Sequence, residues 1–498
     1  MMRSTIDVLL DEPIGTINRN LYGHFIEHLG RCIDDGLWVG EDSTIPNEHG
    51  IRLDVIRALQ KIRPPLLRWP GGSFADDYHW QDGIGPRSER PRRVNIWWGN
   101  AIETNAFGTH EFMHLCRAIG AQPYLCGNVG NGTPRELREW VEYCNYPAGT
   151  TLSDSRIRNG AEHPFGVKYW AIGNESWHSG GSFNPEEYVT EYCRFSTFAR
   201  EFGPDKLYLV ACGPSGNDLS WTERFFTRLK DRIAPITLHA FSGHYYIGRA
   251  GTATGFSEDE WYDLLWQVRA IETLIVEQRA LMDQFDPERK VHFVVDEWGA
   301  LHPPEPGGSA SILWQQSSLR DGLFAALVLN IFNRHAEKVT MANLAQAVNV
   351  VQALILTEEE RMVVTPTYHV FDMYQSHQGA QSIRLVVDSP ETDFSYGDEA
   401  KSIPALTGSA SLRDGILTLT IVNTSLGEHC EATLRIHGAV AREMRETVLT
   451  HENIRAHNTF VDPDQVVPSA VRTMPVEGSA IVHTFGPRSV SKLQFALS

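Results

Sequence analysis

Short apolar runs alternate with amphipathic helical segments from about residue 20 to residue 352. Most of these runs are rich in β-branched or aromatic residues and lack regular polar alternation, which is typical of strands buried on both faces. We predict eight strands of this kind, at residues 21–27, 65–69, 122–128, 167–173, 207–212, 236–246, 291–297 and 339–343.

The segments between these runs carry helix signals. Asn184, Pro185 and Glu187 supply an N-cap, a proline at the first helical position and a capping-box acid. Residues 133–136 repeat this arrangement, and residues 259–285 carry a long apolar stripe at helical spacing. The pattern therefore predicts helices that begin near residues 134 and 185, and a long helix over 259–285.

Eight strands that alternate with helices over this length favour an α/β fold, a (β/α)8 TIM barrel, which we place at residues 16–372. The alternative is a doubly wound open sheet. That fold is disfavoured because no glycine-rich phosphate loop follows the first strand.

The pattern changes after about residue 371, where helical periodicity mostly disappears. Residues 416–422 and 432–436 are β-rich patches between Gly, Asn and Asp turns. We predict a C-terminal β-sandwich, jelly-roll-like in character, over residues 373–498. Residues 5–10 also have the pattern of a strand, and we assign residues 1–15 to the sandwich because the barrel count is complete without them.

Composition narrows the class of protein. The 498 residues carry a formal charge of −18, so a nucleic-acid or anionic-membrane partner is not expected. No apolar stretch approaches a membrane span, and the apolar run at the N-terminus is too short for a signal peptide. The seven cysteines form no CxxC pair, which predicts free thiols without a zinc site. We therefore expect a cytoplasmic protein that uses no cofactor or metal.

Polar side chains gather at the ends of the predicted strands. Active sites of barrel enzymes lie at the C-terminal ends of the strands, so these residues share one rim. Single residues of this kind are common, but a succession of them on strand after strand is not explained by fold stability alone. The rim residues are Glu27, Arg68, Trp69, Asn128, Asn174, Glu175, His244, Tyr246, Glu297, Trp298, Asn343 and Gln346.

Two carboxylates, Glu175 and Glu297, end the fourth and seventh predicted strands, which lie across an eight-stranded barrel from each other. Retaining cleavage of a glycosidic bond needs two carboxyl groups about 5–5.5 Å apart. One attacks the anomeric carbon and the other acts as acid and then as base. A strand-end acid on its own more often caps a helix or pairs with an arginine, but the joint placement favours a catalytic pair.

Other rim residues have side chains suited to binding a sugar. Asn174 is positioned to bind the sugar 2-hydroxyl, a contact that strengthens toward the transition state. Glu27, His244, Tyr246 and Gln352 offer hydrogen bonds to further hydroxyls. Two tryptophans, Trp97 and Trp98, offer an apolar platform for a sugar face, with core packing as the alternative for at least one of them.

The ordered motifs resemble glycoside hydrolase family 51, the α-L-arabinofuranosidases. The resemblance runs through the whole predicted barrel and into the C-terminal region. The matching stretches are YGHFIEH at 22–28, RWPGG at 68–72, FGTHEF at 107–112, GNE at 173–175, HYY at 244–246, DEWG at 296–299, MANLAQ at 341–346, NVVQ at 349–352 and HNTF at 457–460.

The resemblance implies a retaining, exo-acting α-L-arabinofuranosidase with Glu297 as nucleophile and Glu175 as acid/base. It implies an arabinofuranosyl oligosaccharide as substrate, no catalytic metal, and a homo-oligomer that is often a hexamer. It also implies an arabinofuranose subsite lined by Glu27, Arg68, Asn174, His244, Tyr246 and Gln352.

Three positions depart from the family pattern. Ser73 stands at a sugar-contacting position where many members have Asn, Gly243 stands where Leu is usual, and Leu301 replaces an aromatic residue of several relatives. Two alternatives stay open: a related retaining barrel glycosidase for another pentoside or a β-glucan, and a non-catalytic carbohydrate-binding protein. The second predicts the loss of at least one acid, whereas both acids are present.

Overall fold

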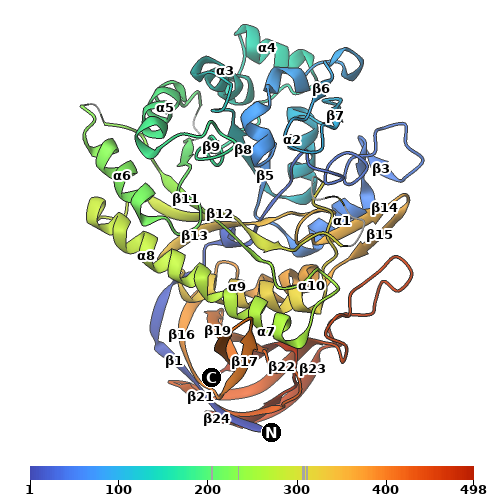
Figure 1. The fold of residues 1–498 in the computed structure, drawn as a ribbon, viewed down its shortest axis with the longest axis vertical. Helices are drawn as coiled ribbons and strands as arrows, with labels where there is room; N and C mark the ends of the chain where they lie inside the picture. Colours follow the sequence, from blue (N-terminus) through green and yellow to red (C-terminus); the bar gives the residue numbers. More distant parts are fainter. Residues whose placement is uncertain (204–205, 234, 306–308, 310–311) are drawn as a thin grey trace.

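A closed parallel barrel forms the core of the part of the molecule that precedes the C-terminal sheet (Figure 1). The structure is a computed structural model that describes residues 1–203, 206–233, 235–305, 309 and 312–498. Each barrel strand hydrogen-bonds to the next one along the chain, and the last closes the ring on the first. In chain order the strands are β2 (Gly23–Phe25), β5 (Leu66–Trp69), β8 (Gln122–Gly127), β9 (Tyr169–Ile172), β10 (Tyr208–Ala211), β11 (Ala240–Gly248), β12 (His292–Leu301) and β13 (Val339–Ala345).

The predicted barrel is confirmed, and each predicted apolar run overlaps one of its strands. The bounds differ, because β2 is short whereas β11, β12 and β13 extend past the predicted ends. Between β11 and β12, Gly243 pairs with Val295 and His244 pairs with Glu297, which leaves Asp296 as an extra residue. This bulge lengthens β12 and changes the direction of the side chains that follow it.

Helices cover the outside of the barrel. Asn184 caps α5 through the Glu187 N–H, and Thr133 caps α3 through the Glu136 N–H, as the sequence predicts. The helices are α1 (Leu53–Ile62), α2 (Thr109–Ile119), α3 (Pro134–Asn145), α4 (Thr151–Arg158), α5 (Pro185–Phe198), α6 (Leu219–Lys230), α7 (Glu258–Gln267), α8 (Arg269–Phe285), α9 (Leu319–Arg334) and α10 (Pro366–Tyr374).

The single long helix expected over residues 259–285 is wrong. The chain forms α7 and α8, which are separated at Val268. The Val268 N–H donates to the Trp266 carbonyl instead of continuing the helical ladder. The apolar spacing continues through the break, which is why the periodicity of the sequence does not reveal it.

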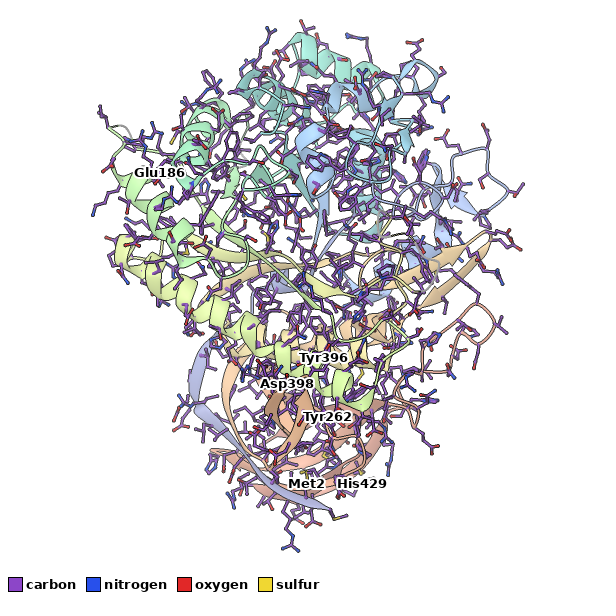
Figure 2. The ribbon with its side chains drawn as sticks, viewed as in Figure 1. Met2, Glu186, Tyr262, Tyr396, Asp398 and His429 are labelled. Atoms are coloured by element: carbon purple, nitrogen blue, oxygen red, sulfur yellow. The ribbon has the colours of Figure 1, made fainter. Side chains whose placement is uncertain are left out.

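The C-terminal region forms one curled nine-stranded sheet around its own apolar core. The first strand of the chain lies in this sheet between β16 and β21. Met2 lies beside His429 and donates to its carbonyl at 2.9 Å (Figure 2). The strands are β1 (Met2–Thr16), β16 (Gln381–Asp388), β19 (Leu406–Arg413), β20 (Ile416–Asn423), β21 (Cys430–His437), β22 (Ala441–Thr450), β23 (Arg472–Gly478), β24 (Ala480–Phe485) and β25 (Ser489–Leu497).

Helices α9 and α10 lie between the barrel and this sheet (Figure 1). Short hairpins and 3-10 turns complete the described fold. The hairpins are β3 (Asn47–Glu48) with β4 (Ile51–Arg52), β6 (Arg93–Val94) with β7 (Ile102–Glu103), β14 (Ile355–Glu358) with β15 (Arg361–Val364), and β17 (Glu391–Tyr396) with β18 (Glu399–Pro404). The 3-10 turns are η1 (Arg19–Tyr22), η2 (Ser73–Asp77), η3 (Trp80–Gly83), η4 (Arg87–Glu89) and η5 (Gln375–His377).

Two further properties bear on the class of protein. All seven cysteines are buried free thiols. Within the described residues, no helix combines the length and apolarity that crossing a membrane requires.

Candidate active site

Glu297 lies at the centre of a polar cluster inside the mouth of the barrel. It follows the bulge in β12 and is 4% exposed. Its Oε1 accepts a hydrogen bond from Arg68 Nη1 at 2.5 Å, and its Oε2 accepts one from the Tyr246 hydroxyl at 2.7 Å. His244 Nδ1 lies 3.6 Å from Oε2. The structure therefore brings four of the predicted site residues together.

The neighbours of Glu297 keep its carboxyl ionised. Burial alone raises the pKa of Glu297, because a charged group loses its hydration. The charges of His244 and Arg68 and the donors on Arg68 and Tyr246 outweigh burial, so the pKa lies below its ordinary value. A buried carboxylate that stays ionised is suited to act as a nucleophile.

Glu175 reaches the same space from the loop that follows β9. Its backbone is in the left-handed region, with φ of +38°, two residues after Gly173 at +84°. The side chain is 17% exposed, and its Oε1 lies 3.2 Å from His244 Nδ1. A carboxylate oxygen of Glu175 and one of Glu297 lie within 4.8 Å of each other. The chain turn after β9 thus aims this side chain across the barrel mouth.

His244 lies between the two carboxylates. Burial lowers the pKa of His244, but Glu297 and Glu175 outweigh it and raise the pKa above its ordinary value. The ligand atoms of these three residues are close enough to hold a metal ion. The Arg68 guanidinium on Glu297 disfavours a cation there, because it already supplies positive charge at the same carboxylate.

Arg68 forms the floor of the cluster. It is fully buried at the end of β5, with its guanidinium 4.7 Å from the centre of the Phe25 ring. Besides Glu297, it donates from Nη2 to Asn174 Oδ1 at 2.6 Å. This bond fixes the Asn174 amide, whose Nδ2 is buried without a hydrogen-bond partner within the described structure. An amide donor held ready in this way can bind a sugar hydroxyl.

Glu27 lies beside this cluster and links three segments of the rim. Its carboxylate accepts hydrogen bonds from the Phe74 N–H at 3.1 Å, Trp98 Nε1 at 3.0 Å and Gln346 Nε2 at 2.9 Å. Burial and then the charge of Glu297 raise the pKa of Glu27 to about 7, although these three donors oppose the rise. The predicted residue Trp98 is therefore held next to Glu27, and its contact with a sugar stays a prediction.

Three residues that the sequence singled out, Ser73, Trp97 and Leu301, are half-buried. Ser73 begins η2 next to Gly72, where an added Cβ would lie 3.0 Å from Glu297 Oε1. Trp97 lies 5.9 Å, ring to ring, from His178 on the loop after Glu175. Leu301 ends β12 and is half-buried.

Gln352 lies outside the cluster of hydrogen bonds around Glu297. It is fully buried, its Oε1 accepts from the Ala300 N–H at 2.9 Å, and its Nε2 donates to the Asp321 carbonyl at 2.9 Å and to Thr367 Oγ1 at 3.4 Å. These bonds tie the end of β12 to the starts of α9 and α10. A sugar contact for Gln352 stays a prediction.

Sequence reasoning missed Asp76, which lies on η2 and contacts the loops after β8 and β9 through backbone donors. It carries no motif signal, because any buried acceptor with the right reach would serve the same donors. Gln346 was recognised as a rim residue but not as a partner of Glu27. Sequence reasoning also gave no role to Asp296. Its Oδ2 accepts a hydrogen bond from the Tyr124 hydroxyl at 2.9 Å and lies 3.7 Å from Arg68 Nε.

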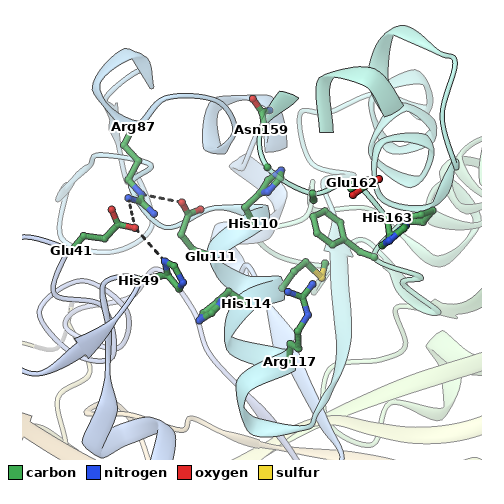
Figure 3. Close-up of a pocket in the computed structure, with 15 residues that line it drawn as sticks. Glu41, His49, Arg87, His110, Glu111, His114, Arg117, Asn159, Glu162 and His163 are labelled. Atoms are coloured by element: carbon green, nitrogen blue, oxygen red, sulfur yellow. Dashed lines mark hydrogen bonds and ion pairs between the residues drawn. The ribbon is translucent and has the colours of Figure 1, made fainter. Parts of the chain in front are cut away.

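A second polar cleft of about 700 Å³ lies on the outer side of the barrel beside α2 (Figure 3). Its charged lining is largely paired: Arg87 contacts Glu41 and Glu111, and His49 contacts Glu41. His110 lies 2.6 Å from the Tyr143 hydroxyl, and burial lowers the pKa of this histidine to about 4. The cleft contains none of the rim residues, so we assign it no catalytic role.

Two family models and several curated relatives that match this chain carry the same name, alpha-L-arabinofuranosidase. Residues 58–254 match the model of the alpha-L-arabinofuranosidase 1 domain, and residues 296–489 match that of the alpha-L-arabinofuranosidase C-terminal domain. The chain is 38% identical over 492 residues to an intracellular exo-alpha-L-arabinofuranosidase of Bacteroides ovatus, covering 99% of this chain and 95% of that protein. It is 32% identical over 448 residues to alpha-L-arabinofuranosidase C of Emericella nidulans, covering 86% of each.

Solved structures show the same relationship. The family 51 arabinofuranosidase from Xanthomonas axonopodis pv. citri superposes with a TM-score of 0.94 at 38% identity, covering 99% of this chain and 100% of that one. The alpha-L-arabinofuranosidase of Thermotoga maritima, solved as an arabinose complex, gives 0.87 at 32% identity and covers 99% of both chains.

The closed barrel and the paired glutamates at its mouth define the class: a barrel glycoside hydrolase. The sequence and structure comparisons narrow that class. The chain belongs to glycoside hydrolase family 51, the α-L-arabinofuranosidases.

Proposed function

We propose that the protein is a retaining, exo-acting α-L-arabinofuranosidase that releases terminal arabinofuranose from arabino-oligosaccharides. The observation that carries the proposal is the pair of glutamates with oxygens within 4.8 Å, of which Glu297 is buried with a lowered pKa and Glu175 is partly exposed. That separation is close to the roughly 5–5.5 Å of retaining enzymes and shorter than the roughly 6.5–9.5 Å of inverting ones.

The two glutamates have different roles in a double displacement. In the first step a Glu297 oxygen attacks the anomeric carbon, the glycosidic bond breaks, and Glu175 gives its proton to the leaving oxygen. In the second step Glu175 takes a proton from water, the water oxygen attacks the anomeric carbon, and the ester bond to Glu297 breaks. Glu175 suits the acid/base role because solvent reaches its carboxylate.

The remaining residues of the cluster hold the sugar and the charges. The Asn174 amide donor binds the 2-hydroxyl, and Glu27, His244, Tyr246 and Ser73 face other hydroxyls. The names of the relatives from Bacteroides ovatus and Emericella nidulans support arabinofuranose as the sugar. We propose Gln352 as a further, more distant contact.

A substrate panel and two variants test the proposal. Among nitrophenyl glycosides, the wild type is expected to hydrolyse the α-L-arabinofuranoside fastest; a preference for another pentoside or a β-glucan would favour the related-glycosidase alternative. Glu297→Ala is expected to lose activity on every substrate. Glu175→Ala is expected to lose most activity on poor leaving groups, and azide is expected to restore turnover on good ones. Equal losses on all leaving groups without azide rescue would remove Glu175 from this role.

We also propose a cytoplasmic location and a homo-oligomer, up to a hexamer. The name of the intracellular Bacteroides ovatus relative and the seven buried free thiols support the location. The oligomer follows from the family resemblance, and light scattering in solution measures it directly. We place the domain boundary at residue 372, with residues 1–15 in the C-terminal domain; limited proteolysis tests that boundary.

A further inference from the structure

Asp76 is a buried carboxylate that holds three backbone donors beside the active site. It lies on η2 and is 3% exposed. Its Oδ1 accepts hydrogen bonds from the Val129 N–H at 2.9 Å and the Gly130 N–H at 3.1 Å, and its Oδ2 accepts one from the Asn174 N–H at 2.9 Å. One side chain thus joins three rim loops, those that follow β5, β8 and β9.

The hydrogen bond from the Asn174 N–H to Asp76 lies just after β9, where the backbone adopts positive φ angles. Asn174 lies between Gly173 and Glu175, both in the left-handed region at φ of +84° and +38°. A glutamate in that region is strained and persists only when its surroundings hold it there. The Asp76 carboxylate supplies such a hold on the peptide immediately before Glu175.

The surrounding chain leaves the carboxylate no freedom to move. An added Cβ at Gly180 would lie 2.7 Å from Asp76 Oδ2, so only glycine allows the loop after Glu175 to pass this close. The same loop folds back on Glu175, whose carbonyl accepts from the His178 N–H at 2.7 Å and the Gly180 N–H at 3.2 Å. Asp76 is therefore packed against both ends of the turn that carries Glu175.

Asn174 is consequently fixed from two directions. Asp76 accepts a hydrogen bond from its backbone N–H and Arg68 donates one to its side-chain oxygen, while its Nδ2 stays buried without a hydrogen-bond partner among the described residues. We propose that Asp76 is a positioning residue, which sets the directions of the Asn174 amide and the Glu175 carboxylate without contacting the sugar. This inference rests on the proposed acid/base role of Glu175.

Asp76→Asn tests the inference with a near-isosteric change. The amide oxygen of the variant can keep the Val129 and Gly130 bonds, whereas its NH2 group faces the Asn174 N–H and cannot accept from it. A displaced Glu175 protonates the leaving oxygen poorly, so the damage is expected to grow as the leaving group worsens. We expect kcat/KM to fall at least tenfold for arabino-oligosaccharides and less than threefold for a dinitrophenyl arabinofuranoside, whose KM is expected to fall because a displaced Glu175 also slows the second step.

The matched control is Asp77→Asn on the same turn. Asp77 accepts only from the exposed Asn131 side chain among the described residues, at 2.5 Å, so its variant is expected to stay within twofold of wild type on both substrates. Rates are referred to active sites counted by the burst of dinitrophenol, which removes any effect of partial unfolding. An equal loss on both substrates, or no loss, would overturn the inference.

Two further outcomes are distinguished. If Asp76→Asn yields no folded protein, Asp76→Glu takes its place, because it keeps a carboxylate but moves it. This variant is expected to show the same dependence on the leaving group. Failure of both variants to fold would make Asp76 a folding residue and overturn the inference. If wild-type enzyme itself cleaves no arabinofuranoside, the proposed function fails, whatever the variants do.

Discussion

At the residue scale, the two central glutamates differ through their neighbours. Glu297 receives hydrogen bonds from a buried guanidinium and from a phenol, whereas Glu175 has one close partner among the described residues, His244, which it shares with Glu297. Donors and positive charge lower the pKa of a carboxyl group against the effect of burial. This difference supports the proposed nucleophile role of Glu297, the side chain whose pKa its neighbours lower.

Replacing Tyr246 by Phe removes one donor from Glu297 and keeps the ring. A hydrogen bond to a charged group contributes about 1.5–3 kcal/mol, so kcat/KM is expected to fall roughly ten- to a hundredfold. Activity that needs ionised Glu297 is present above its lowered pKa and lost as the pH falls through it. Losing the donor raises that pKa, so the acid limb of the pH–rate profile is expected to move to higher pH. Tyr245→Phe, on the opposite face of β11, serves as the control; an unmoved limb in Tyr246→Phe would contradict the assignment.

Replacing Glu27 by Gln tests the raised pKa of that carboxyl. The folded protein holds the Glu27 proton with a pKa of about 7, against an ordinary value of 4.5, so the stability from this proton is full below about pH 4.5 and lost as the pH rises to 7. The amide that replaces the carboxyl does not titrate, and Gln346 can turn its free amide oxygen toward the new NH2 group. The stability of the variant relative to wild type is therefore expected to rise by on the order of 3 kcal/mol between pH 4.5 and pH 8. Urea unfolding at several pH values measures this difference; a difference that stays constant or falls with pH would refute it.

The candidate site was predictable where residue type carries the chemistry. Glu175, Glu297 and Arg68 stand at strand ends that apolar patterning can locate, and the structure brings them together. Asp76 was not predictable, because it acts on backbone donors that every residue possesses. Gln352 was expected at the sugar, but its amide is used within the protein, and the sequence does not reveal which buried donors need an acceptor.

At the element scale, apolar patterning located every barrel strand but not its length. Burial fixes which residues form a strand, whereas the strand ends depend on pairing with neighbours, as the Asp296 bulge shows. The break between α7 and α8 at Val268 was also not predictable, because the apolar stripe of the sequence continues across it. Gln352 connects several elements, because its side-chain amide forms hydrogen bonds with β12, α9 and α10.

Gln352→Ala separates its linking role from a direct sugar contact. The change leaves the Ala300 N–H and the Asp321 carbonyl buried without their partner, which is expected to cost about 2–4 kcal/mol of stability. Thermal and urea unfolding of the variant measure that loss. Native stability together with a raised KM would instead make the sugar contact its main role.

At the scale of the whole molecule, the barrel and the C-terminal sheet are joined through buried polar contacts. Asn330 on α9 accepts hydrogen bonds at Oδ1 from the hydroxyls of Ser409 at 2.8 Å, Thr420 at 2.7 Å and Tyr374 at 3.2 Å. The sequence predicts both parts of the molecule, but not their contact surface, because Ser409 and Thr420 come from strands β19 and β20, remote from α9 along the chain. These contacts make the sheet a support for the barrel.

Asn330→Ala is expected to destabilise the protein without changing its chemistry. Buried hydroxyls left without their acceptor cost about 1–3 kcal/mol each, reduced where they can turn to another partner, so the free energy of unfolding is expected to fall by about 2–4 kcal/mol. Calorimetry measures this loss, and kcat/KM well below the melting temperature is expected to stay within twofold of wild type. A fall in activity at unchanged stability would show that α9 acts on the site directly.

The central claim is that Glu297 forms a covalent bond to the sugar. Glu175→Ala treated with a dinitrophenyl arabinofuranoside is expected to accumulate this intermediate, because the good leaving group departs unaided while the water that releases the sugar lacks its base. Peptide mapping by mass spectrometry is expected to find the arabinosyl group on the peptide that contains Glu297. An adduct on another residue, or turnover with no adduct at any time, would contradict the account.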